Sequence, residues 1–193
     1  MRRTAVIDMG SNSFRLVVYG WEPGRYWQHV DEIREAVRVS AGMSQSGAIK
    51  KSRVKRALRT AVVFASFCEH SGIDDVRAVA TSAIRDASNR DELLAEMTSQ
   101  SGLDVQVLST EDETRYGYLA IANTTTVESG WGLDMGGGSL QLMRVEDRQL
   151  RESGSWPLGA VRVSEAFLDD VALRGPGAPE IEAARSEWER SHA

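Results

Sequence analysis

The sequence predicts an α/β protein in which three opening strands are followed by helices and strands in alternation. Short apolar runs rich in β-branched residues end at glycine-rich turns, and longer segments repeat apolar residues every three or four positions. The strand and turn pattern of the N-terminal part also returns near residue 131. The chain is therefore expected to contain two related α/β domains.

The first predicted elements form an antiparallel meander. Residues 4–9 and 14–21 are expected as strands on either side of a turn at residues 10–13, and residues 26–30 and 33–39 provide further strand. A helix over 52–70, a strand over 76–80, a helix over 89–97, a strand over 103–108 and a helix over 111–123 follow. This order is that of a ribonuclease H-like domain.

The pattern restarts after the polar stretch 123–126. Strands are expected over 131–135, 140–145 and 150–155, followed by a helix over 161–168, a turn at 175–177 and a helix over 179–190. We interpret this as an internal duplication. The first ribonuclease H-like domain is placed at residues 1–125 and the second copy at 126–193, which is incomplete because no further strand-helix-strand-helix half follows.

Composition limits the possible functions. The 193 residues are 41% hydrophobic, enough for one domain core or two small ones, and their net charge of −5 argues against a surface that holds nucleic acid in general. No stretch approaches a membrane span or a signal-peptide core, so a cytoplasmic protein without membrane contact is expected. The single cysteine, Cys68, lies in an apolar helical stretch and is expected in the core.

One basic cluster stands out against this acidic background, where the helix over 52–70 begins. A solvated helix face is the favoured interpretation, and attraction of a polyanion is the alternative. The cluster consists of Lys50, Lys51, Arg53, Lys55, Arg56 and Arg59.

Two glycine-containing turns each follow an aspartate that ends a predicted strand. Asp8 precedes Gly10, Ser11, Asn12 and Ser13, and Asp134 precedes Gly136, Gly137, Gly138 and Ser139. Glycine lets the backbone approach an anion, while N–H groups and short side chains donate hydrogen bonds. A simple hairpin would also explain the first turn, whereas three consecutive glycines are harder to explain that way. Together, the aspartates could hold a hydrated Mg²⁺ and the turns could grip phosphates.

Two further segments carry candidate residues with ordinary alternatives. Glu113 lies among three acids that follow a predicted strand; a capping box with Thr110 is the favoured interpretation from spacing alone, and a catalytic carboxylate is the alternative. Arg85 follows another strand closely, and either binds phosphate or pairs with Asp86 or Asp91.

A resemblance to a known family emerges when five segments are taken in series. In order and spacing they resemble the exopolyphosphatase and guanosine pentaphosphate phosphatase (Ppx/GppA) family, over about residues 4–168. The segments are AVIDMGSNSFRLVVY, VRAVATSAIRDASNRDELL, VQVLSTEDETRYGYLA, GLDMGGGSLQL and WPLGAVRVSEAFL. The resemblance implies the actin-like ATPase fold, and metal-dependent removal of a terminal phosphate from polyphosphate or from guanosine pentaphosphate.

The resemblance also implies roles for individual residues. Glu113 lies where the family has the glutamate of Glu-Ala-Arg, which implies the base that activates water, and Asp8 and Asp134 correspond to Mg²⁺-associated aspartates. Arg85 matches the arginine of a Thr-Ser-Ala-x-Arg segment and is implied to bind phosphate. The remaining phosphate-binding positions implied are Gly10, Ser11, Asn12, Ser13, Gly136, Gly137, Gly138 and Ser139.

The sequence departs from the family pattern in two ways. Where the family usually has Ser-Thr-Glu, this chain has Ser139, Leu140 and Gln141, and glutamine cannot carry the charge of a glutamate. Activity is expected to be lower if that position supports metal or water. Family members also continue for longer, so a homodimer or a missing C-terminal partner chain is expected to complete the second copy.

Three functions remain open at this point. The first is a phosphatase acting on polyphosphate or guanosine pentaphosphate. The second is a module that binds these phosphates without turnover, or a partner subunit. The third is another superfamily member such as a sugar kinase or an actin-like ATPase, against which the Gly-Ser-Asn-Ser turn and the Glu113 segment argue.

Overall fold

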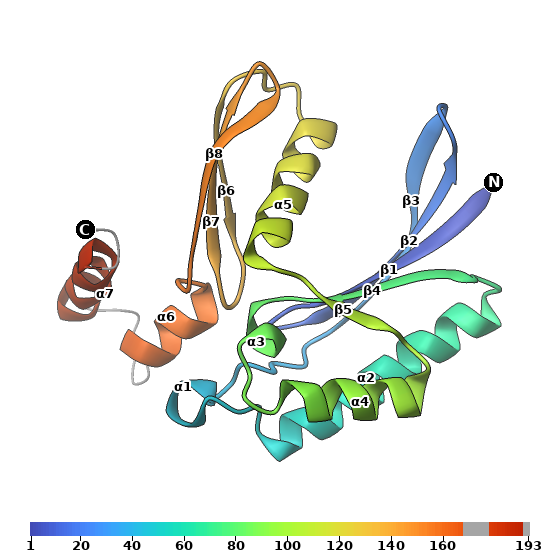
Figure 1. Ribbon diagram of the computed structural model, residues 1–193, viewed down its shortest axis with the longest axis horizontal. Coiled ribbons are helices and arrows are strands. Elements are labelled where there is room, and N and C mark those ends of the chain that lie inside the picture. The colour runs from blue at the N-terminus through green and yellow to red at the C-terminus, as the bar shows by residue number, and fades with distance from the viewer. Residues whose placement is uncertain (168–177, 191–193) are drawn as a thin grey trace. The chain divides into compact units, whose positions relative to one another are not determined.

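The computed structural model describes residues 1–167 and 178–190 (Figure 1). The chain divides into two compact units, Met1–Ser109 and Thr110–Ala193. Helix α5 (Thr110–Thr124) belongs to the second unit because it packs on the strands that follow it. The predicted domain boundary after residue 125 differs from this division into units and stays a proposal.

The first unit is built on a five-stranded sheet in the order β3-β2-β1-β4-β5. Strands β1 (Arg2–Met9), β2 (Phe14–Glu22) and β3 (Tyr26–Glu35) pair antiparallel, as the predicted meander requires. Strands β4 (Asp75–Ala80) and β5 (Val105–Val107) continue the sheet parallel to β1. Parallel neighbours need crossover connections, and helices provide them here.

Two helices cover one face of this sheet. Figure 1 shows α2 (Lys51–His70) and α4 (Arg90–Ser101) side by side along it. The apolar residues that recur along α2 are buried in the same core cluster as Ala5, Ile7 and Met9 of β1. Cys68 lies in this core, where burial raises the pKa of its thiol, so its predicted core role is confirmed.

The second unit is built on a three-stranded antiparallel sheet in the order β6-β7-β8. Its strands are β6 (Gly130–Met135), β7 (Leu140–Glu146) and β8 (Gln149–Trp156). Helix α5 packs on this sheet, and α6 (Ala160–Phe167) and α7 (Ala178–Arg190) follow. Alternate residues of β7 are buried, which is the pattern of a strand with one face in a core.

The sheets of the two units begin with the same strand and turn geometry. Asp8 and Met9 of β1 lie opposite Arg15 and Phe14, and Asp134 and Met135 of β6 lie opposite Gln141 and Leu140 in the same register. Four residues therefore form each turn. Their exposure differs: the alternate β1 residues Ala5, Ile7 and Met9 are fully buried, whereas Trp131, Leu133 and Met135 of β6 are 65%, 63% and 55% exposed.

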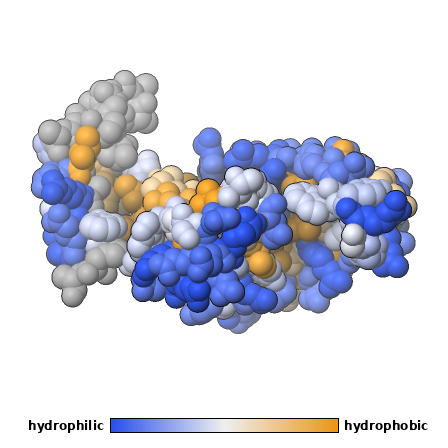
Figure 2. Space-filling model, turned by 90° about the horizontal axis from the view of Figure 1, so that it is seen from above, coloured by the Kyte–Doolittle hydropathy of each residue, from blue (hydrophilic) through white to orange (hydrophobic). Residues whose placement is uncertain are grey.

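The outer surface is mostly polar. Figure 2 shows a mostly hydrophilic face with hydrophobic residues exposed in several places. Among the helices that the structure describes, none has the length and apolar character needed to span a bilayer.

Most predicted elements are confirmed, with small differences. Residues 33–39 do not form a strand throughout, because β3 ends at Glu35 and the following segment turns to contact residues 11 and 12. Two four-residue helices, α1 (Met43–Ser46) and α3 (Ser82–Arg85), were not predicted, and β5 is shorter than expected. The predicted turn at residues 175–177, and residue 168 at the end of a predicted helix, lie outside the described residues.

Candidate functional site

The first turn, residues 10–13, is closed by a hydrogen bond from the N–H of Gly10 to the carbonyl of Ser13, 3.2 Å long. Ser11 is buried, and its Oγ lies 3.1 Å from Oγ of Ser82 in α3. A Cβ on Gly10 would come within 3.2 Å of the Ser13 carbonyl oxygen, so a larger residue would crowd the turn. The turn is thus anchored to the chain that follows β4.

The loop after β3 fixes the orientation of this turn. The N–H of Arg38 donates to the Asn12 carbonyl at 2.7 Å, and the N–H and hydroxyl of Ser40 both donate to the Ser11 carbonyl at 3.2 Å. Arg34 Nε also donates to Ser13 Oγ at 3.2 Å. The carbonyls of residues 11 and 12 therefore face protein donors.

Arg85 lies in α3, the same short helix that contacts Ser11 through Ser82. Its Nη1 donates to the Leu108 carbonyl at 3.0 Å, and its Nε lies 3.5 Å from the Asp86 carboxylate. Of the two predicted acidic partners, the structure places Asp86 beside Arg85, whereas Asp91 pairs with Arg90. These contacts hold the guanidinium in a fixed place within the first unit.

The second unit brings together Glu113, Ser139 and Gln141. The Ser139 hydroxyl donates to Glu113 Oε1 at 2.9 Å, and Gln141 Nε2 donates to Ser139 Oγ at 3.0 Å. Ser139 and Gln141 are buried, so these polar atoms depend on one another for hydrogen bonds. Because the amide can only donate through Nε2, it directs the Ser139 proton toward Glu113.

The carboxyl group of Asp134 lies close enough to Glu113 for their charges to interact. The residue is exposed as a whole, but protein atoms around its carboxyl group and the negative charge of Glu113 raise its pKa above that of an ordinary aspartate. Asp134 also lies opposite Gln141 in the β6–β7 pairing. Three of the predicted site residues of this unit, Glu113, Asp134 and Ser139, are thus neighbours.

The glycine turn, residues 136–139, is closed like the first one, by a 2.9 Å hydrogen bond from the Gly136 N–H to the Ser139 carbonyl. Helix α6 supports it: the N–H groups of Ala160 and Val161 donate at 2.9 Å to the carbonyls of Gly136 and Gly137. A Cβ on Gly159 would overlap the backbone of Gly137 and Gly138. Only glycine can occupy position 159 without moving the turn.

The residues of the two turns lie outside the pairings of the strands that they connect. The N–H groups of Ser11, Asn12 and Ser13, and those of Gly137, Gly138 and Ser139, make no hydrogen bond to any residue the structure describes. Successive backbone N–H groups without a protein acceptor can form the concave kind of site that binds anions. Each turn can therefore donate several hydrogen bonds to phosphate oxygens.

The carboxylates suit a cation held mainly by water and phosphate. Within residues 1–167 and 178–190 no group of three or more His, Cys, Asp or Glu side chains is arranged to hold a metal ion. Mg²⁺ is commonly bound by one or two carboxylates together with waters and substrate phosphates. Asp134 beside Glu113 fits that donor set: burial and the charge of Glu113 raise the Asp134 pKa, and a bound cation would oppose both effects.

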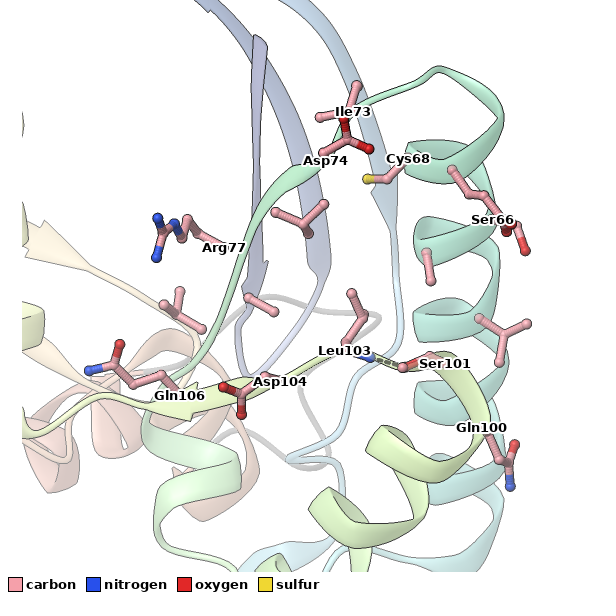
Figure 3. Close-up of a pocket in the computed structure, with 17 residues that line it drawn as sticks. Ser66, Cys68, Ile73, Asp74, Arg77, Gln100, Ser101, Leu103, Asp104 and Gln106 are labelled. Carbon is pink, nitrogen blue, oxygen red and sulfur yellow. Dashed lines mark hydrogen bonds between the residues drawn. The ribbon is translucent and has the colours of Figure 1, made fainter. Parts of the chain in front are cut away.

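A pocket of about 700 Å³ lies in the first unit and includes none of the predicted site residues (Figure 3). Arg77 of β4, Asp104 and Gln106 line it, and the Leu103 N–H donates to Ser101 Oγ at 3.2 Å at its rim. The chemistry of the two turns is therefore not associated with this pocket.

Two residues that support the site, Gln141 and Gly159, were not predicted as site residues from the sequence. Gln141 was noted only as a departure from the family, and Gly159 was included only within a resembling segment. A glycine between a strand and a helix was the available signal for Gly159, since such a residue often marks a close backbone approach.

The chain is similar in sequence and in fold to several known proteins. The chain is 32% identical over 170 residues to exopolyphosphatase 1 of Mycobacterium tuberculosis, covering 87% of this chain and 49% of that protein. The crystal structure of the Aquifex aeolicus Ppx/GppA family member superposes with a TM-score of 0.75 at 29% identity, over 94% of this chain and 58% of that one. An exopolyphosphatase from Cytophaga hutchinsonii gives a TM-score of 0.81 at 25% identity, over 86% and 54%.

The chain spans about half the length of the curated relatives it matches. Its α/β architecture is that of the Ppx/GppA structures and of the actin-like ATPase fold. The family model of the Ppx/GppA phosphatases matches residues 17–191, and on this match the chain belongs to the Ppx/GppA phosphatase family.

Proposed function

We propose that this protein hydrolyses the terminal phosphoanhydride of inorganic polyphosphate or guanosine pentaphosphate, with Glu113 as the base that activates water. The observation that carries the proposal is the bond from the Ser139 hydroxyl to Glu113, next to a turn with three N–H groups that have no acceptor among the described residues. A carboxylate of fixed orientation and an anion site are the two things that phosphoanhydride hydrolysis requires of a protein.

Each residue has a defined role in this reaction. Glu113 accepts a proton from the attacking water, whose oxygen bonds to the terminal phosphorus while the bridging oxygen leaves with the shortened phosphate chain. The N–H groups of residues 137–139 stabilise the negative charge on the terminal phosphoryl oxygens. Ser139 keeps the Glu113 carboxylate in position through its hydrogen bond.

Asp134 in the second unit and Asp8 in the first are each proposed as Mg²⁺ ligands; when bound, the ion would neutralise phosphate charge and orient the phosphoryl group. Residues 10–13 and Arg85 are proposed to bind phosphate in the first unit. The contacts of Arg85 with Leu108 and Asp86 support this role, because they hold the guanidinium before any ligand binds.

A second candidate function is binding without turnover, with the chain as a phosphate-binding module or a partner subunit. Gln141 favours it, because an amide stands where the family usually has a carboxylate. We also propose that the protein is cytoplasmic and that its first domain ends after residue 125. A homodimer or a C-terminal partner chain is proposed to complete the second domain.

Phosphate release separates the two functions. Purified protein with Mg²⁺ and either substrate should release phosphate, and Glu113→Gln should not, although it should still bind. Binding by both proteins with release by neither would establish the binding module instead.

A further inference from the structure

Residues 34–59 form a strongly basic segment in an acidic chain. The segment holds eight lysines and arginines and one acid, Glu35, whereas the whole chain has a net charge of −5. All eight are exposed except Arg53, which is half-buried. We call this stretch the basic segment; its cations are Arg34, Arg38, Lys50, Lys51, Arg53, Lys55, Arg56 and Arg59.

Most of these cations have no acidic partner. Arg56 lies 3.9 Å from Glu35, and this is the one ion pair that the described part of the chain gives to the segment. Arginines elsewhere are commonly paired, including Arg15 with Glu32 at 2.6 Å and Arg77 with Asp75 at 2.9 Å. Like charges gathered without partners repel one another, so an anionic ligand would stabilise the segment.

The basic segment is attached to the first phosphate turn. Arg34 donates to Ser13 Oγ, and the Arg38 N–H donates to the Asn12 carbonyl. Farther along, the side chain of Lys50 lies over Gly42, in the loop that continues from Ser40. The segment therefore places one cation, Arg34, against the turn, and a second group of cations begins at Lys50, at the start of α2.

We propose that the basic segment is a subsite for the distal part of a long linear polyphosphate whose other phosphates bind at residues 10–13. The inference rests on the proposed function and specifies its substrate class. A guanosine pentaphosphate offers only a short run of phosphates, which would not extend along α2. Polyphosphate carries charge along its whole length and can neutralise successive lysines and arginines.

Nucleic acid fits the basic segment less well. Proteins that hold single strands usually stack bases on aromatic side chains as well as neutralising the backbone. Residues 34–59 contain no phenylalanine, tyrosine or tryptophan. The segment offers charge without base recognition, which suits an anion that has no bases.

Neutralisation of exposed cations tests the proposal. The variant K51Q/K55Q/R59Q removes three charges from the exposed face of α2, and R25Q/R151Q/R185Q removes three exposed charges elsewhere. Binding of labelled long-chain polyphosphate and of tripolyphosphate to the full chain is measured over a range of salt concentrations. Gln has a helix propensity close to that of Lys and Arg, so α2 should stay folded.

The proposal expects K51Q/K55Q/R59Q to bind long polyphosphate at least about tenfold more weakly. A plot of the logarithm of its binding constant against the logarithm of salt concentration should also be shallower, by about two in slope. Tripolyphosphate binding should change less than about twofold, and the control variant should bind both normally. Equal weakening in the control, equal weakening for tripolyphosphate, or unchanged binding of the long chain would overturn it. So would tighter binding of a single-stranded oligonucleotide than of polyphosphate.

The catalytic proposal is decided separately, by phosphate release from tripolyphosphate. That release should depend on Glu113 and not on the basic segment. A chain that releases no phosphate but shows length-dependent binding lost in K51Q/K55Q/R59Q would keep the subsite and reject the enzyme. A chain that releases phosphate but binds polyphosphate of all lengths equally would keep the enzyme and reject the subsite.

Discussion

The hydroxyl of Ser139 donates a hydrogen bond to the carboxylate of Glu113, with 2.9 Å between Oγ and Oε1. The two residues come from a glycine turn and from the first turn of α5, separated by 26 positions in the sequence. This bond links the glycine turn, which we propose to bind phosphate, to the acid that the family resemblance implies as the base. It gives the proposed reaction a physical basis within a single unit.

Ser139→Ala should lower kcat with little effect on KM. The variant removes the donor that orients Glu113, and a hydrogen bond to a charged group contributes about 1.5–3 kcal/mol. That corresponds to a loss of about tenfold to a hundredfold in rate. Steady-state phosphate release measures it.

The matched control is Ser155→Ala, since Ser155 accepts a longer, 3.4 Å bond from the same Gln141. It should retain nearly full activity. Equal activity of the Ser139→Ala protein and the unmodified protein would show that the bond does not position the base.

Asp134→Asn should stabilise the metal-free protein at neutral pH. Burial and the charge of Glu113 raise the Asp134 pKa in the folded state, so ionisation of this group opposes folding. Its contribution to stability is fully present below the unfolded-state pKa and is lost as pH rises through the raised folded pKa. The amide cannot ionise and avoids this loss.

Urea unfolding of both proteins from acidic to neutral pH tests the direction of this stability difference. The variant should gain stability relative to the unmodified protein as pH rises, and Asp104→Asn, on the first unit, should not. A relative gain at low pH instead would contradict the cause given for the shift.

Gly159→Ala should destabilise the second unit and weaken phosphate binding. A methyl group at this position would overlap the backbone of Gly137 and Gly138, which cannot move aside as a flexible side chain would. Overpacking of this kind costs about 1–3 kcal/mol. Denaturant unfolding and tripolyphosphate binding measure the two effects.

Gly130→Ala is the control, because a Cβ there would meet a Val127 methyl group at an ordinary 3.5 Å. It should leave stability nearly unchanged. A Gly159→Ala protein as stable as this control, with normal binding, would mean that the contact does not support the turn.

The sequence was enough to predict the order of the main elements, because their periodicity is local. It failed after β3, where β-branched Val37 and Val39 suggest strand. Val37 and Val39 are buried, and the segment gives backbone hydrogen bonds to the first turn, with Arg38 at a left-handed φ of 54°. Such a partner is tertiary and leaves no periodic signal.

The same reasoning applies to the site. Glycines and aspartates in each turn follow local rules, so they were predicted. The capping-box spacing of Thr110 and Glu113 gave no indication of a bond to Ser139. Likewise, no spacing shows that Gln141 donates to Ser139, or that Gly159 packs on the glycine turn.

The most direct test of the central claim is phosphate release by the purified chain with Mg²⁺ and polyphosphate, beside Glu113→Gln and the matched control Glu111→Gln in the same helical turn. The account predicts release that falls by about 10²- to 10⁴-fold in Glu113→Gln, with polyphosphate still bound, and release close to normal in Glu111→Gln. Equal release by the unmodified protein and Glu113→Gln would contradict the assignment of the base.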